Sequence, residues 1–323
     1  MIRGWRSVWV GAALLVSVPA CDSTSPTAGI DRGGVRTPVS AQGPITGFGS
    51  IIVNGVHYSL DAAEVRIEGG LGAEGDLALG QVVTIRGGRD AGSDRASADR
   101  VAFTSNVQGP VLTVDAAAGT LVVLGQDVST DAATVFDLGA RAPGVASLVA
   151  GEIVRVSGFV SADGAITATR IEQRAAGSEL RVAGRIAALN RAAARFEINS
   201  LVVSYAAAVA IEGFPDGEPD DGDEVIVVGT ALAAGGSLLA RTLERRAEEI
   251  EGREGEEFEI EGRITRFVSP QDFDVSAVTV TTTATTQYEH GTAANLALNL
   301  KVHVSGRVNA ALQFEARKVE IED

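Results

Sequence analysis

One short sequence pattern, V-x-V-x-G or a close variant, recurs four times and constrains the fold more than any other feature of the chain. The four copies end at Gly87, Gly158, Gly229 and Gly306, about 70 to 80 residues apart. Solenoid repeats are usually about 20 to 45 residues long, so this period corresponds to one small domain. The sequence therefore predicts tandem domains of one kind.

Each copy belongs to a set of about five short strands in the same order. An opening strand with a glycine precedes a hairpin, which is clearest at Asn54-Gly55, where both residues suit the positive φ angles of a type I′ turn. The V-x-V-x-G strand and a closing strand follow, and their polar and apolar residues roughly alternate. In the fourth repeat Asn299 replaces the glycine that enters the V-x-V-x-G strand, and Asn also tolerates a left-handed turn.

Five short antiparallel strands can close a small barrel, and closure removes the exposed edges through which tandem units pair wrongly. Aromatic residues make up only 5% of the chain, so Val, Ile, Leu and Ala must fill the cores. We predict an all-β fold of four tandem small OB-like β-barrel repeats with four separate cores, at residues 43–104, 105–175, 180–243 and 258–323.

The segments outside the repeats differ from them in composition. Residues 22–42 are rich in Ser, Thr, Pro, Gly and Ala without sustained periodicity, so we predict a flexible spacer over 21–42. Residues 244–257 mix acidic residues with arginines and contain no proline. This composition predicts a solvated, partly helical charged linker between the third and fourth repeats.

The first 21 residues have the features of a lipoprotein leader. Arg3 and Arg6 precede an apolar stretch over 8–18, and a small-residue cleavage site directly precedes Cys21, the single cysteine. We expect a signal peptide over 1–20 and lipidation of Cys21 with palmitate or a related acyl chain. The alternative is an ordinary signal peptide whose cysteine stands there by chance. The leader predicts a cell-envelope location, lipid-anchored to a membrane, in the periplasm or on the outer surface.

The net charge limits the classes of partner. The chain carries a formal charge of −15, and the leader contributes two arginines and no acidic residue, so the mature chain is more acidic still. Such a balance disfavours nucleic acid and anionic lipid head groups. A nucleic-acid-binding barrel also needs a basic groove with stacking aromatics. We therefore expect no nucleic-acid partner and attachment to the membrane through the lipid rather than a basic patch.

Three segments of the first repeat carry a resemblance to a known family. Gly47-Phe48-Gly49-Ser50-Ile51-Ile52-Val53-Asn54-Gly55, with residues 79–83 and 98–101, resembles the repeated domain of unknown function numbered 5666 found in bacterial exported proteins. The resemblance covers nearly all of residues 43–323 and is weaker in the fourth repeat. It implies a β-barrel module and an envelope location, and it transfers no catalytic residues.

Candidates for catalysis are few. The sequence contains no G-x-S-x-G, H-E-x-x-H, Walker loop or C-x-x-C. His57, His290 and His303 are far apart in sequence or on different strands, and a solvated or strand-face role suits each better than metal ligation. We predict that the protein is not an enzyme and needs no cofactor.

One acidic turn in the third repeat concentrates oxygen ligands of the kind that calcium prefers. An EF-hand loop starting there would need glycine where Asp221 stands and glutamate where Val227 stands, so we expect a solvated loop, with calcium binding as the weaker alternative. The weak candidate ligands are Asp216, Glu218, Asp220, Asp221 and Asp223.

Three functional classes follow from these observations. The leading expectation is a membrane-anchored, non-catalytic binding or scaffold module for a protein partner. The alternative is a carbohydrate- or peptidoglycan-binding lipoprotein, because barrels of this kind hold oligosaccharides on one sheet face. Exposed tyrosines among Tyr58, Tyr205 and Tyr288 would favour the glycan. The third is an enzyme, for which two carboxylates facing one cleft would be the sign.

Overall fold

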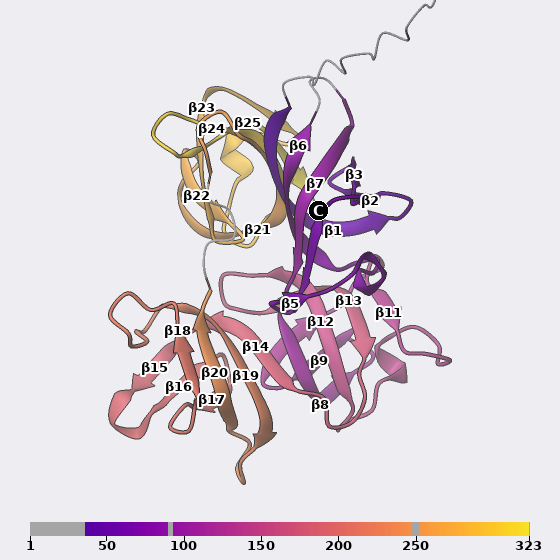
Figure 1. Ribbon diagram of the computed structural model, residues 1–323, viewed down its shortest axis with the longest axis vertical. Coiled ribbons are helices and arrows are strands. Elements are labelled where there is room, and N and C mark those ends of the chain that lie inside the picture. The colour runs from indigo at the N-terminus through magenta and orange to yellow at the C-terminus, as the bar shows by residue number, and fades with distance from the viewer. Residues whose placement is uncertain (1–35, 90–92, 247–251, 323) are drawn as a thin grey trace, which may run out of the picture. The chain divides into compact units, whose positions relative to one another are not determined.

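The computed structural model describes residues 36–89, 93–246 and 252–322 (Figure 1). The predicted signal peptide and Cys21 lie outside these residues. The described chain consists of strands β1 to β25 and short 3₁₀ turns, so the predicted all-β class is confirmed. Within these ranges no helix is long and apolar enough to cross a membrane.

The strands of the first repeat form a closed ring. β1 pairs with β2, β2 with β3, β3 with β7, β7 with β6, and β6 with β1 again. β4 pairs with β7 beyond β3, so β3 and β4 act as one interrupted strand. The strands are β1 (Thr37–Gly47), β2 (Ile51–Val53), β3 (Val56–Ser59), β4 (Glu64–Ile67), β5 (Gly70–Leu71), β6 (Val82–Arg89) and β7 (Arg95–Phe103).

The second repeat closes in the same order, with β8 pairing with both β9 and β12. The third does so as well, because β14 continues as β15 after a break at Ile186. Their strands are β8 (Val107–Asp115), β9 (Thr120–Val123), β10 (Gln126–Ser129), β11 (Val135–Asp137), β12 (Ile153–Val160), β13 (Ile166–Gln173), β14 (Leu180–Arg185), β15 (Ala187–Asn190), β16 (Arg195–Ile198), β17 (Leu201–Ser204), β18 (Ala210–Glu212), β19 (Glu224–Leu232) and β20 (Leu238–Arg245).

The fourth ring has five strands, and Figure 1 shows β21 to β25 curling around a common centre. The strands are β21 (Glu257–Ser269), β22 (Asp272–Val275), β23 (Val278–Glu289), β24 (Lys301–Val308) and β25 (Phe314–Glu322). The expectation of wholly antiparallel barrels is wrong. In each ring the third strand pairs in parallel with the last: β3 with β7, β10 with β13, β17 with β20 and β23 with β25. The V-x-V-x-G strand, which lies between these two in sequence, runs opposite to both.

Packing against the closing strand explains the glycine of the V-x-V-x-G pattern. At Gly87, Gly158, Gly229 and Gly306 a Cβ atom would lie less than 3.0 Å from a backbone carbonyl oxygen of the closing strand. Each glycine also adjoins a shift in the pairing register, where the strand bulges. No side chain fits there, so the pattern marks the point at which each ring bends.

The glycine that enters the same strand has a different role. Gly80, Gly151 and Gly222 have φ angles of 79°, 92° and 94°, and Asn299 has 68°. Gly80, Gly151 and Asn299 donate their backbone N–H groups to carbonyls of the opening strand, and Gly222 donates to Ile186 at the break between β14 and β15. The prediction that Asn299 supports a left-handed turn is therefore confirmed.

The buried apolar side chains of the described residues form three clusters rather than the four separate cores that we expected. The first and fourth repeats have one cluster each, whereas the second and third share one. Strand β8 pairs with β14 at this seam, and Val107 opposite Val182 is fully buried. Strand β1 pairs in parallel with β21, but the cores on the two sides remain distinct.

Two predicted boundaries change. Strand β1 begins at Thr37 because it pairs with β6 and β21, so residues 37–42 do not belong to a flexible spacer. In the charged segment Glu244 and Arg245 belong to β20, and residues 252–256 form a turn rather than a helix. Glu256 is buried and accepts a hydrogen bond from the Ser40 hydroxyl, so the segment is not wholly solvated.

Candidate functional site

The Glu68 carboxylate connects three repeats. Glu68 and Gly69 form a two-residue turn between β4 and β5, and both have positive φ angles, 54° and 83°, as a type I′ turn requires. The Glu68 carboxylate accepts the backbone N–H of Ser105 at 3.3 Å. It also lies 3.1 Å from the Arg181 guanidinium and 3.9 Å from that of Arg155. A strained turn therefore carries a carboxylate that holds arginines of the second and third repeats.

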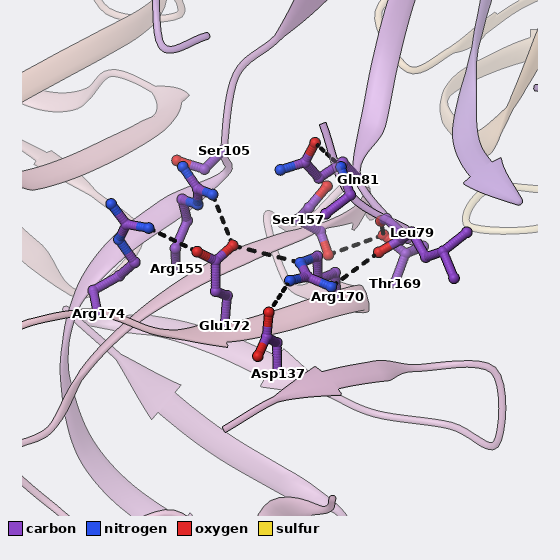
Figure 2. A network of polar contacts seen from close by, with 12 residues as sticks. Leu79, Gln81, Ser105, Asp137, Arg155, Ser157, Thr169, Arg170, Glu172 and Arg174 are labelled. Atoms are coloured by element: carbon purple, nitrogen blue, oxygen red, sulfur yellow. Dashed lines mark hydrogen bonds and ion pairs between the residues drawn. The ribbon is translucent and has the colours of Figure 1, made fainter. Parts of the chain in front are cut away.

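Beyond Arg155, ion pairs continue across the second repeat, and those of Glu172 with Arg155 and Arg170 are largely buried (Figure 2). Glu172 accepts hydrogen bonds from Arg155 and Arg174, each at 2.7 Å, and lies 3.4 Å from Arg170. Arg170 also donates to Asp137. Burial by itself raises the pKa of Glu172, but the hydrogen bond and charge of Arg155, the hydrogen bond from Arg174 and the charge of Arg170 outweigh it and lower the pKa.

The same network attaches the second repeat to the loop that enters β6. The Ser157 hydroxyl accepts the backbone N–H of Val82 at 2.8 Å, and Arg170 donates to the Leu79 carbonyl at 3.3 Å. Thr169 donates its hydroxyl to the Gly80 carbonyl. We use the name polar junction for the ion pairs of Glu172 and Arg170 together with these contacts of Ser157, Thr169 and Arg170 with the loop. Its charged groups are engaged with one another, so its role is to fix the second repeat against the first.

A cavity of about 450 Å³ lies beside Glu68 and differs from the rest of this acidic chain. Among the residues that the structure describes, its walls hold five arginines and two glutamates. We call it the arginine-lined cavity, and its charged residues are Arg66, Arg86, Arg100, Arg181, Arg246, Glu68 and Glu244.

One wall is the outer face of the sheet formed by β6, β7 and β4. Ile85 and Val101 are fully buried inside the barrel, so alternation turns Arg86 and Arg100 outward. These two arginines are directly opposite each other in the β6–β7 pairing. Arg66 on β4 lies opposite Ala102, which is two residues beyond Arg100 on β7. Like charges directly opposite on neighbouring strands are destabilising by themselves, so contacts with other groups, such as that of Arg100 with Glu64 at 3.6 Å, must offset this repulsion.

The other wall belongs to the third repeat. Arg181 stands on β14 between the buried Leu180 and Val182, and it therefore points out of its barrel toward Glu68. Arg246 directly follows β20, and its backbone N–H donates to the Glu224 carbonyl at 2.7 Å. Arginines from two repeats that are far apart in sequence thus line one space.

A second cavity, of about 370 Å³, adjoins the first. The two share Thr84, Ala102, Thr104 and Arg246 in their walls. Neutral amide and hydroxyl groups predominate in the second cavity, with contributions from every repeat: Gln42, Asn106, Ser161, Asn199, Thr265 and Ser276 are among them. An arginine-rich cavity thus adjoins one in which neutral polar side chains outnumber the charged residues Asp163, Arg185, Glu224 and Arg246.

The structure brings two of the three histidines together, which their sequence positions did not indicate. The Nδ1 atoms of His290 and His303 lie 3.6 Å and 4.0 Å from the carboxylate oxygens of Glu320. His57 lies elsewhere, with its Nδ1 3.2 Å from the Ser50 hydroxyl. Among the residues described, no three His, Cys, Asp or Glu side chains are grouped as a metal ion would need.

The carboxylates of the acidic turn are engaged with the protein. Asp220 and Glu218 pair with Arg191, Asp221 accepts the backbone N–H of Leu189, and Asp223 pairs with Arg245. Asp216 is exposed on the same turn. Binding of calcium would have to break these contacts, and the solvated loop remains our prediction.

The tyrosines do not form an exposed surface. Tyr58 is fully buried, and burial raises its pKa well above the ordinary value. Tyr205 and Tyr288 pack against the cores of their own barrels. The aromatic side chains that would have favoured a glycan therefore serve packing.

Comparison with known proteins identifies the family. The model of the family described as Domain of unknown function (DUF5666) matches residues 38–101, 108–172 and 261–320, together more than half of the chain. The protein therefore belongs to this family, as its repeats predicted. The third repeat lies between the matched ranges, yet its strands pair in the same order as those of the others. No curated protein matches the chain.

Proposed function

We propose that the protein is a membrane-anchored, non-catalytic envelope protein that acts as a binding or scaffold module. The observation that supports this role most is the arginine-lined cavity, formed where the outer faces of separate barrels meet. Rigid barrels that present such a space offer a recognition surface without a reacting group. The order of strands in each ring fits the OB-like type that we expected from the sequence.

The lipid anchor is part of the same proposal. Cys21 follows an apolar leader and would tether the barrels to a membrane of the cell envelope, in the periplasm or on the outer surface. The chain as a whole is strongly acidic, so we expect the lipid rather than basic residues to hold it there, and we expect no nucleic-acid partner.

A carbohydrate- or peptidoglycan-binding role is the second candidate. The neutral cavity favours it, because side chains such as Asn106, Asn199 and Ser161 can exchange hydrogen bonds with sugar hydroxyls. The lack of an exposed tyrosine platform on the described barrels weighs against it. We therefore rank it below the protein-binding module.

Affinity capture from native envelope tests the proposal. The lipidated full-length protein should retain a reproducible protein partner after cross-linking, and the purified protein should hydrolyse no ester, peptide, glycoside or nucleotide. Retention of purified glycan strands in place of proteins would promote the second candidate. Specific hydrolysis that is lost in His57→Ala, His290→Ala or His303→Ala would refute a non-catalytic role.

A further inference from the structure

We propose that the fourth repeat is a detachable module, and that the surface it occupies on the first and second repeats is also a docking surface for the fourth repeat of a second copy of this chain. This inference goes beyond the proposed function, because it concerns association of the protein with itself. It starts from a difference between seams, since the second and third repeats share an apolar core and the fourth repeat shares none.

The fourth repeat is complete without its neighbours. Its strands close a ring of their own, and its cluster of buried apolar side chains contains, among the described residues, none from another repeat. The second and third repeats differ, because Val107 and Val182 are fully buried where β8 meets β14 and belong to one shared cluster. Separation of those two repeats would expose a core, whereas separation of the fourth repeat would leave its core intact.

Polar side chains fasten the fourth repeat to the first. The Ser40 hydroxyl donates to the Glu256 carboxylate. The Asn54 side-chain amide, which a left-handed turn places at the seam, donates to the Glu259 carbonyl at 3.1 Å. The Arg89 guanidinium lies 2.7 Å from the Glu259 carboxylate. Water can replace each of these partners when the repeats separate, so the net loss for each hydrogen bond is small.

The contacts of the fourth repeat with the second are also polar, with one aromatic ring among them. Asn299 Oδ1 accepts a backbone N–H of the β12–β13 hairpin at 2.7 Å, and Arg263 donates to the Thr167 hydroxyl at 3.1 Å. The Lys301 ammonium lies 5.1 Å from the centre of the Phe159 ring. Domains whose interface is not a large hydrophobic one move relative to each other by default. The fourth repeat can therefore leave both neighbours as a folded unit.

The strand edges that undocking uncovers indicate which partner takes its place. β1 and β21 pair in parallel over residues 39–42 and 257–260, and separation leaves the backbone groups of both edges without these partners. A strand that restores the pairing must also supply an acceptor for Ser40 and a carboxylate for Arg89. A second copy of the chain supplies both at identical positions, and reciprocal exchange covers every edge in a closed dimer.

The covalent connection to the third repeat sets the balance between the two forms. It gives the fourth repeat a high effective concentration at its own chain, so docking within one molecule predominates. The exchanged dimer contains the same contacts as the monomer, so it is a minor species that grows with protein concentration. The proposed lipid anchor would concentrate copies at a membrane, but the inference does not depend on it.

Cysteine trapping tests the exchange in the full-length chain with Cys21→Ser, which removes the single natural cysteine. One variant also carries Ser40→Cys and the other Glu256→Cys, at side chains that touch across the seam and are buried in the docked state. When the two are mixed under mild oxidation, we expect a disulfide-linked heterodimer whose yield rises with concentration. Gln126→Cys mixed with Asn199→Cys is the matched control, because these side chains touch across the seam of the shared core, and it should give no heterodimer.

Two further variants make the result decisive. The chain that carries both Ser40→Cys and Glu256→Cys should form the bridge within one molecule. Asn54→Gly keeps a residue that tolerates the left-handed turn but removes the amide from the seam, so heterodimers should form about twofold to tenfold faster in its presence. An intramolecular bridge without heterodimer above the control, or equal rates with and without Asn54→Gly, would overturn the inference.

A measurement without cysteines covers the case in which the doubly substituted chain forms no bridge. Unlabelled and isotope-labelled chains are mixed at high concentration and followed by native mass spectrometry. Mixed dimers that form faster with Asn54→Gly would support exchange, because both forms contain the same contacts and only the opening of the seam becomes easier. Monomers alone, or mixed dimers that form at an unchanged rate, would overturn it.

Discussion

Substitution of Glu172 by glutamine tests whether the polar junction holds the second repeat in place. Arg155 and Glu172 are 2.7 Å apart, with only 10% and 14% of their side chains exposed. Removal of one partner of a buried pair destabilises a protein by about 3 to 5 kcal/mol. Glutamine retains one acceptor oxygen, so we expect the lower end of this range, about 3 kcal/mol or roughly a hundredfold in the unfolding equilibrium.

Hydrogen exchange is the assay, because it localises the effect in a chain of several barrels. Peptides from β12 and β13 should exchange much faster in Glu172→Gln, while peptides from the fourth repeat should change little. Glu179→Gln, at a half-exposed ion pair with Arg241, is the control and should lose less than about 1 kcal/mol. Equal losses in the two variants would refute a structural role for the junction.

The dependence on pH gives an independent check of the same residue. The pKa of Glu172 is lower in the folded protein than its ordinary value of about 4.3. Its stabilisation is therefore complete above that value and is lost as pH falls through the folded pKa. The stability gap between wild type and Glu172→Gln should narrow below about pH 4. A gap that stays constant down to pH 3 would contradict the assignment.

The remaining predictions concern the entry glycines and the anchor. At Gly80, which has φ 79°, a Cβ atom would lie 2.5 Å from the Thr169 carbonyl oxygen, whereas at Gly151, with φ 92°, it would meet nothing within 4 Å. The free energy of unfolding should therefore fall by about 1 kcal/mol in Gly151→Ala, for its backbone angle alone, and clearly more in Gly80→Ala. Urea unfolding followed by circular dichroism measures both values. Equal losses in the two variants would show that the contact with Thr169 is unimportant. Cys21→Ser should release the protein from the membrane fraction and abolish palmitate labelling, and a mutant that stays in the membrane, together with an unlabelled wild type, would exclude the anchor.

Much of the fold was predictable because its determinants are local. A bulge opposite a carbonyl excludes any side chain, so Gly87 and its three counterparts recur at one place in each barrel. A left-handed entry turn restricts the choice to glycine or asparagine, as Gly80 and Asn299 show. Constraints of this kind act within one residue or between adjacent strands of one hairpin, and a single chain displays them four times.

The cavity could not be predicted because it depends on neighbours that are distant in sequence. Alternation around Ile85 and Val101 indicates that Arg86 and Arg100 point outward, but the same pattern is typical of any solvated face. Net charge does not indicate it either, because a sum over the whole chain conceals a local cluster of arginines in an acidic protein. The sequence by itself determined the barrels and their repetition through backbone geometry. Only the tertiary structure decided which outer faces meet, because that choice depends on contacts such as Glu68 with Arg181, across more than a hundred residues of chain.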